Sequence, residues 1–156
     1  MKKLSFLFLA AMGPFLLLQA EVATTSAPTA TSANPVLSPE MEGQLQAGEI
    51  TTNAWLNIVD KGEYTKSWDE MSSITRNTVK KDEWEKILSK TRKPLGGVKK
   101  REVVDIRSAI NPKNLPAGNY MVMVYKTSFA TKSDGHELVT LFLQDGQWHV
   151  LTYQID

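Results

Sequence analysis

Hydrophobic positions recur with a helical period in the first half of the chain and with a strand period in the second half. Over residues 50–61, large apolar side chains return every three or four positions, which predicts a helix. Ser38 and Pro39 suit the start of this helix, because serine caps helices and proline loses only an unpaired N–H there. Glycines and threonines between residues 43 and 52 are poor helix formers, so the first half of the helix is expected to be its weaker part.

Two shorter helices are predicted to follow, over residues 63–71 and from a cap at Thr78 to residue 91. The second half is rich in β-branched and aromatic residues at strand spacing. Strands are predicted over residues 98–110, 119–129, 136–144 and 147–155. Asp145-Gly146 is a strong hairpin signal between the last two strands. The third strand is apolar on both of its faces, which is typical of a strand inside a sheet.

Helices followed by an antiparallel meander indicate an α+β fold. The sheet needs one covered face, and the N-terminal helices are the elements available to cover it. We therefore expect N-terminal helices packed on a curled four-stranded antiparallel sheet, a cystatin-like or nuclear-transport-factor-like cone. Residues 40–156 are predicted to form this single α+β domain, whose size is ordinary for one core.

The start of the chain has the layout of a secretory signal peptide. Lys2 and Lys3 precede an apolar run over residues 4–18, and Ala20 offers a small residue for cleavage. The run is shorter than the roughly 20 residues of a membrane-spanning helix, and a Gly-Pro pair interrupts it. We expect a signal peptide over residues 1–20, export to the periplasm or the medium, and no integral membrane segment after cleavage. Residues 21–39 are rich in Thr, Ser, Ala and Pro, which predicts a flexible linker.

Composition narrows the possible functions. The chain has 18 Lys and Arg, 17 Asp and Glu, two His and no Cys. Near-zero net charge gives no electrostatic case for nucleic acid as a partner. Without cysteine there are no disulfides, thiolate zinc sites or catalytic thiols. We expect no cofactor, no metal and no catalytic residue, since the sequence holds no phosphate loop and no nucleophile elbow.

Short blocks of sequence, several of them centred on tryptophan, carry a family resemblance. The blocks are Ala54-Trp55-Leu56-Asn57-Ile58-Val59-Asp60-Lys61-Gly62-Glu63-Tyr64, Ser67-Trp68-Asp69, Glu83-Trp84, Pro94-Leu95-Gly96, Tyr125-Lys126-Thr127-Ser128-Phe129-Ala130, Glu137-Leu138-Val139-Thr140-Leu141 and Asp145-Gly146-Gln147-Trp148. In order and spacing they resemble the bacterial family of domains of unknown function numbered 4019, over about residues 53–155. The resemblance implies a small exported bacterial protein, and it brings no activity to any residue.

One candidate site is a pocket inside the cone. Glu137 shares a predicted strand face with Val139 and Leu141, so its carboxylate is expected to point inward and to meet a cation or a tyrosine. The aromatic side chains either line a ligand cavity or fill the core, and both interpretations stay open. Tyr125 and Glu137, on neighbouring strands, are expected to be able to bond each other. The candidate pocket residues are Trp55, Trp68, Tyr125 and Glu137.

A second candidate is the basic stretch from Lys90 to Arg101. It is either a solvated helix end and strand edge or a surface for anionic lipid or glycan. Lys99, Lys100 and Arg101 form the candidate anionic-surface patch.

These features favour an exported bacterial domain that acts as a non-enzymatic periplasmic binding or interaction module. Two alternatives stay open. One is a small-molecule-binding or enzymatic cone with a pocket near Tyr125 and Glu137. The other is a cell-envelope binder that uses the basic stretch. The partners considered are an envelope protein and a second copy of the chain, and nucleic acid is not expected.

Overall fold

The structure is a computed structural model that describes residues 38–156. The predicted signal peptide and residues 21–37 of the predicted linker lie outside the described residues. Five helical segments come first along the described chain: α1 (Pro39–Asp60), α2 (Tyr64–Asp69), α3 (Ser73–Thr78), α4 (Lys81–Thr91) and the short 3-10 helix η1 (Lys93–Leu95). Four strands follow: β1 (Val98–Ile110), β2 (Asn119–Phe129), β3 (Gly135–Gln144) and β4 (Gln147–Ile155).

Helix α1 begins where the sequence predicts. Ser38 is the N-cap, and its Oγ accepts a hydrogen bond of 3.3 Å from the Met41 N–H. Pro39 follows in the first turn, which also carries two acidic side chains that favour a helix N-terminus. Although the first half contains two glycines, the helix is continuous to Asp60. Gly62, with a φ of 77°, lies just beyond its end.

The shorter helices differ from the prediction in one place. Residues 73–78 form α3, a helix that the hydrophobic spacing did not indicate. Ser72 caps it by accepting from the Thr75 N–H at 3.4 Å, and the Thr75 hydroxyl donates to the Leu151 carbonyl on β4 at 2.6 Å. Thr78 was predicted to cap the next helix, and this prediction is wrong, because Thr78 is the last residue of α3. Helix α4 starts at Lys81 without a side-chain cap.

The four strands form an antiparallel sheet in the order β1-β2-β3-β4. This meander confirms the predicted α+β fold, and the sheet is open. Asp145 and Gly146 both have positive φ, as the tight turn between β3 and β4 requires. Register shifts interrupt β1 near Lys99 and Val104. At the other end of the sheet, the Ser72 N–H donates to the Val150 carbonyl at 2.8 Å, so the β4 edge is partly occupied.

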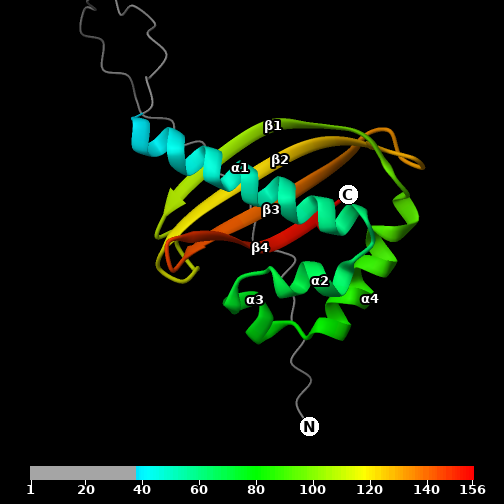
Figure 1. Ribbon diagram of the computed structural model, residues 1–156, viewed down its shortest axis with the longest axis horizontal. Coiled ribbons are helices and arrows are strands. Elements are labelled where there is room, and N and C mark those ends of the chain that lie inside the picture. Colours follow the sequence, from blue (N-terminus) through cyan, green and yellow to red (C-terminus); the bar gives the residue numbers. More distant parts are fainter. Residues whose placement is uncertain (1–37) are drawn as a thin grey trace, which may run out of the picture. The chain divides into compact units, whose positions relative to one another are not determined.

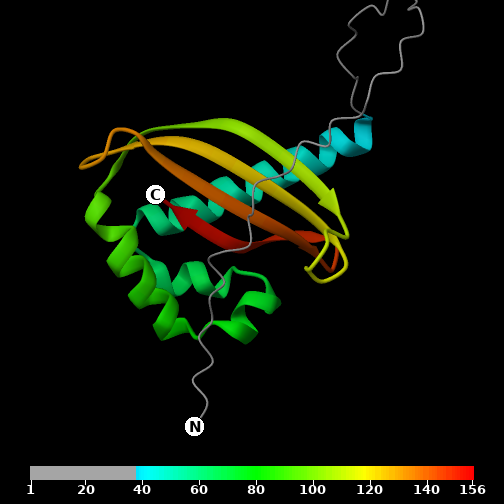
Figure 2. The ribbon, with the colours of Figure 1, turned by 180° about the vertical axis from the view of Figure 1, so that it is seen from behind.

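The helices pack against only one of the two faces of the sheet. Helix α1 crosses one face of the sheet, and α2 and α3 lie beside β4 (Figure 1). Seen from behind, the strands lie in front and none of these helices covers them (Figure 2). A Cβ at Gly48 would come within 2.8 Å of Met121 Cε, so this glycine allows α1 its close approach to β2. The sheet therefore has an inner face that packs on α1 and an outer face that no described helix covers.

The core lies between α1 and the inner face. Its largest fully buried apolar side chains come from α1, α4, the segment after α2 and the inner positions of the strands. They are Leu56, Val59, Met71, Leu88, Met121, Met123, Tyr125, Phe129, Val139, Leu141 and Val150. Within residues 38–156, none of the helices combines the length and the apolar character that crossing a membrane requires.

Candidate functional site

Four charged side chains meet on the inner side of β1 and β3, beside the end of α1. They are Asp60, Arg92, Arg101 and Glu137, and we call them the buried charge cluster. Glu137, on β3, is completely buried, and the Arg101 side chain is 15% exposed. Two acids and two guanidinium groups balance the formal charge of the cluster, so it has no net charge left for a ligand to neutralise.

Every oxygen of the Glu137 carboxylate is occupied. Oε2 accepts from Arg101 Nε at 2.6 Å and from the Thr127 hydroxyl at 2.6 Å. Oε1 accepts from Arg101 Nη2 at 3.1 Å and from the Tyr153 hydroxyl at 2.5 Å. Four donors from three strands thus surround one buried carboxylate, which is the condition under which a buried charge is tolerated.

The other half of the cluster joins α1 to α4 and β1. Asp60 Oδ2 accepts from Arg101 Nη1 at 2.7 Å, and Asp60 Oδ1 accepts from Arg101 Nη2 at 2.9 Å and Arg92 Nη2 at 3.0 Å. Arg92 also donates to the Gly96 carbonyl at 2.6 Å, and its guanidinium lies 4.7 Å from the centre of the Phe129 ring. Arg92 Nε is buried and finds no hydrogen-bond partner among residues 38–156.

The pKa shifts follow from these contacts. Burial would raise the pKa of Asp60, but its hydrogen bonds and charge interactions with Arg101 and Arg92 hold that pKa below its usual value. Burial would lower the pKa of Arg101, yet its bonds to Asp60 and Glu137 raise it, so the guanidinium stays charged. Burial, reinforced by the Glu137 carboxylate, raises the pKa of the Tyr153 hydroxyl. Tyr153 therefore stays neutral and serves as a hydrogen-bond donor.

The strand register explains why these residues meet. Arg101 lies directly opposite Thr127 on β2, and Tyr125 lies opposite Glu137 on β3. Residues 101, 127 and 137 all point to the inner face, because side chains alternate along a strand. As expected, Glu137 meets both a cation and a tyrosine. The tyrosine is Tyr153 and not Tyr125, whose hydroxyl lies 3.6 Å from Met123 Sδ.

The hydrogen bonds of the buried charge cluster hold several elements of the fold together. General acid–base catalysis needs a carboxyl group that can reach a substrate proton. All four bonds to Glu137 come from the protein itself, so a substrate could reach this carboxylate only by displacing one of them. Through its hydrogen bonds the cluster joins the end of α1 to all four strands and to the end of α4, which indicates a structural role.

The candidate pocket residues lie in one core. Trp55 and Tyr125 are buried, and Trp68 is half-buried. Trp55 packs on Tyr153, with ring centres 5.2 Å apart, so it approaches the Tyr153–Glu137 bond. Trp68 lies farther along the chain, and its indole N–H donates to the Val79 carbonyl at 2.8 Å. The pocket itself remains a prediction.

The tryptophan N–H groups behave as structural donors. Trp55 donates to the Ser67 carbonyl at 2.8 Å, and Trp84 donates to the Ser67 hydroxyl at 3.0 Å. Trp148 donates to Gln44 Oε1 on α1 at 3.1 Å. With Trp68 bonded as described, each of the four tryptophans has its polar atom satisfied within the fold.

The candidate anionic-surface patch is divided between two faces of the sheet. Lys99 is exposed at the first register shift of β1, and Lys100 points to the outer face. Arg101 points to the inner face and belongs to the buried charge cluster. A basic run on a strand has to split in this way, because neighbouring side chains point to opposite faces. Of the three, only Lys99 and Lys100 are exposed to solvent.

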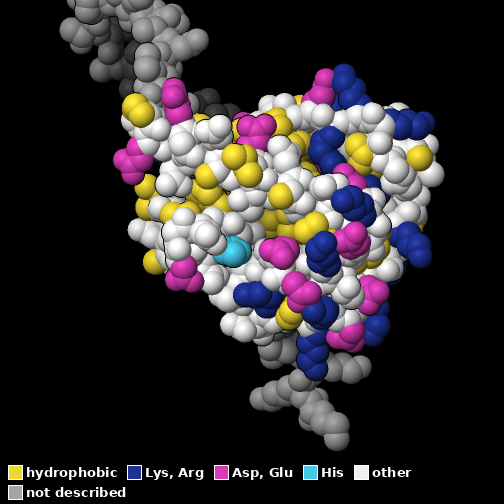
Figure 3. Space-filling model, in the orientation of Figure 1, with side chains coloured by type: hydrophobic (Ala, Val, Ile, Leu, Met, Phe, Trp, Pro, Cys, Tyr) yellow, Lys and Arg dark blue, Asp and Glu magenta, His cyan; other side chains and the backbone are white. Residues whose placement is uncertain are grey.

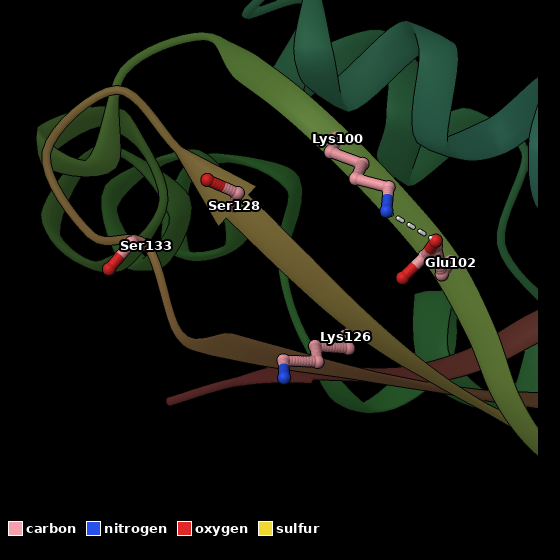
Figure 4. A pocket seen from close by; sticks show the side chains of 5 residues that line it. All are labelled: Lys100, Glu102, Lys126, Ser128 and Ser133. Carbon is pink, nitrogen blue, oxygen red and sulfur yellow. Dashed lines mark ion pairs between the residues drawn. The ribbon is translucent and has the colours of Figure 1, made fainter.

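A polar depression lies on the outer face around Lys100, with a volume of about 180 Å³ (Figure 4). Glu102 from β1, Lys126 and Ser128 from β2, and Ser133 from the following loop complete its lining. Lys100 Nζ lies 2.6 Å from Glu102 Oε1.

The sequence did not reveal several of the functional candidates. They are Asp60, Arg92, Thr127, Tyr153 and the depression around Lys126. Alternation along the first predicted strand indicates that Lys100 and Arg101 point to opposite faces, but only the strand register shows that Arg101 is the one on the Glu137 face. Asp60 and Arg92 gave no such signal, because they come from helix ends whose positions depend on tertiary packing. Among the described residues, no group of three or more His, Asp or Glu side chains is arranged to hold a metal ion.

A comparison with protein-family models finds a match over residues 51–153 to a family described as a protein of unknown function (DUF4019). This match confirms the resemblance that the sequence blocks indicate. No curated protein matches the chain.

Proposed function

The chain belongs to the DUF4019 family, and we propose that it is an exported, non-enzymatic binding module of the bacterial cell envelope. Its inner face serves stability, and its outer sheet face serves binding. The described domain is the part that binds, and the first twenty residues direct export.

The observation that carries this proposal is that both carboxylate oxygens of Glu137 accept hydrogen bonds from other side chains of the protein. In a catalytic cone, an inward carboxylate, a tyrosine and an arginine would act on a substrate. Here the same three groups bond one another, with Glu137 completely buried. The neutral balance of the buried charge cluster also supports a structural role.

The surface supports a binding role on the sheet. Helix α1 and the shorter helices leave the outer face open (Figure 2). On the opposite side, charged groups of both signs gather over α2 and α4, and hydrophobic groups lie over and beside α1 (Figure 3). Because the outer face carries a polar depression among partly exposed strand residues, it offers a ligand both shape and charge.

Export is supported by the sequence of residues 1–20. A short apolar run behind two lysines suits a cleaved leader better than an anchor. The test is cell fractionation of a strain that expresses the full chain, followed by intact mass measurement. We expect a periplasmic or secreted protein whose mass lacks residues 1–20. A cytosolic protein of full mass would overturn the export part of the proposal.

Binding is tested with the purified protein by thermal shift, using muropeptides, lipopolysaccharide and phosphatidylglycerol vesicles as probes. A ligand that binds only the folded state raises the melting temperature by mass action. We expect at least one class of probe to raise it, by the same amount in the wild type and in Tyr153→Phe. No change with any probe would refute the binding role. A response that Tyr153→Phe abolishes, or a chemically altered probe, would favour the small-molecule or enzymatic cone instead.

A further inference from the structure

The polar depression holds donors that the fold does not use. Within the described part of the chain, the Lys126 ammonium and the hydroxyls of Ser128 and Ser133 make no hydrogen bond or ion pair. By contrast, the neighbouring Thr127 hydroxyl, on the inner face, donates to Glu137. These donors come from the outer face of β2 and from the loop that follows it, and they line one depression (Figure 4).

Strand pairing fixes the positions of these donors. Lys100 lies opposite Ser128, and Glu102 lies opposite Lys126; the Arg101–Thr127 pair, which faces inward, lies between these two rungs of the β1–β2 ladder. Ser133 reaches the same depression from the loop between β2 and β3. Two strands and a short loop thus fix the backbone positions of these side chains, and the lysine side chains become ordered when a ligand binds.

We propose that this depression binds a phosphoryl group carried by an envelope component. Two lysines against one glutamate give the site a net positive charge. Lysine binds phosphate as a point charge, and the serine hydroxyls supply further donors to its oxygens. A terminal phosphoryl group has three acceptor oxygens and more negative charge than a carboxylate, so it complements two ammonium groups and two hydroxyls better. The volume of about 180 Å³ suits such a headgroup rather than a whole lipid or glycan chain.

Glu102 acts as a competitor in this site. Its carboxylate holds the Lys100 ammonium at 2.6 Å, and both side chains are well exposed. Exposed ion pairs contribute little to stability, so an incoming phosphoryl group exchanges one anionic partner of Lys100 for another at small cost. Removal of the Glu102 charge should therefore strengthen phosphate binding, which a purely structural pair would not do.

The inference rests on the proposed function, since it names the class of ligand that the outer face takes. It is tested by amide NMR titration of the protein with inorganic phosphate. Lys126→Gln should weaken phosphate binding about fivefold, and Glu102→Gln should strengthen it about threefold. Lys113→Gln and Glu85→Gln are the matched controls, because they change the net charge equally at exposed positions away from the depression.

Two further titrations distinguish the sources of the phosphoryl group. One uses mixed phosphatidylcholine and phosphatidylglycerol vesicles, with pure phosphatidylcholine as the blank, and the other uses N-acetylglucosamine 1-phosphate. Saturable shifts at residues 100, 126, 128 and 133 with either probe support the inference and identify the source as lipid or glycan.

Several results would overturn the inference. These are the absence of shifts at the depression with inorganic phosphate, or equal effects of Lys126→Gln and Lys113→Gln. If phosphate fails while muropeptides or lipopolysaccharide still raise the melting temperature, the phosphoryl inference is wrong and the binding module stands. If no envelope component binds either, both proposals fail.

Discussion

Replacing Glu137 with glutamine tests the buried charge cluster with a minimal change of shape. The amide keeps the size of the side chain and one carbonyl oxygen, but it removes the charge. It also places an NH₂ group where an oxygen accepted two bonds. Either Tyr153 and Arg101 Nη2, or Thr127 and Arg101 Nε, then face a donor instead of an acceptor.

The expected loss is about 3 kcal/mol. Removing one partner of a buried ion pair costs about 3–5 kcal/mol. The low end applies here, because Arg101 is 15% exposed and keeps its two bonds to Asp60. Most domains have an unfolding free energy of about 5–15 kcal/mol, so the variant should remain folded.

Urea unfolding followed by tryptophan fluorescence measures this loss. With a slope of about 2 kcal/mol per molar urea, the midpoint should fall by roughly 1.5 M at unchanged slope. Glu102→Gln removes an exposed carboxylate that is also ion-paired, and it should leave the midpoint unchanged. Equal midpoints for the wild type and Glu137→Gln would refute the structural role of the cluster.

A double-mutant cycle separates the pair from its surroundings. Arg101→Met and Glu137→Met should each be strongly destabilising, because each leaves buried charge without its partner. The double variant should recover at least about 1 kcal/mol of the summed loss. Strictly additive losses, measured by the same urea experiment, would show that Arg101 and Glu137 do not act as a pair.

Three other predictions use different parts of the fold. Gly43→Ala should stabilise α1 by about 0.5–1 kcal/mol, since a Cβ there meets nothing within 4 Å. Gly48→Ala should destabilise the protein by about 1 kcal/mol, because the new Cβ would crowd the Met121 side chain. If the urea midpoints of Gly43→Ala and Gly48→Ala move in the same direction, these two predictions are wrong. Folding raises the pKa of Tyr153 above its usual value of about 10. The neutral hydroxyl therefore contributes to the unfolding free energy fully below pH 10, and this contribution is lost as the pH rises further. Urea midpoints should therefore fall more steeply above pH 10 in the wild type than in Tyr153→Phe. If the midpoints of the two proteins fall in parallel with pH, Tyr153 does not stabilise the fold in this way. Ser67→Ala leaves the buried Trp84 N–H without an acceptor and should lower the unfolding free energy by about 1–3 kcal/mol; an unchanged thermal midpoint would refute this.

Local patterns in the sequence account for most of the elements. The strands over residues 98–110, 119–129 and 147–155 have the predicted bounds, because alternation and turn residues act over short distances. Helix α3 was not predicted, since its formation depends on Ser72 and on the bond from Thr75 to β4, a contact between residues 76 positions apart. A propensity pattern does not contain such a contact.

The candidate site was predictable only in part. Alternation along β3 placed Glu137 inside and indicated a cation or tyrosine as its partner. It did not identify Arg101, which the basic run had suggested for the surface patch. The register between β1 and β2, with its shifts near Lys99 and Val104, decides which basic residue turns inward. The depression needs side chains from two strands and a loop, so it appears only when the register is known.

The central claim is that charge inside the fold is structural and that binding takes place on the outer face. The most direct measurement is an amide NMR titration of the wild type and of the Arg101→Met/Glu137→Met variant with inorganic phosphate. The account predicts shifts at residues 100, 126, 128 and 133 in the wild type, with the same dissociation constant in the double variant. Shifts centred on residues 60, 137 and 153 in the wild type, or a folded double variant that no longer binds phosphate, would contradict it.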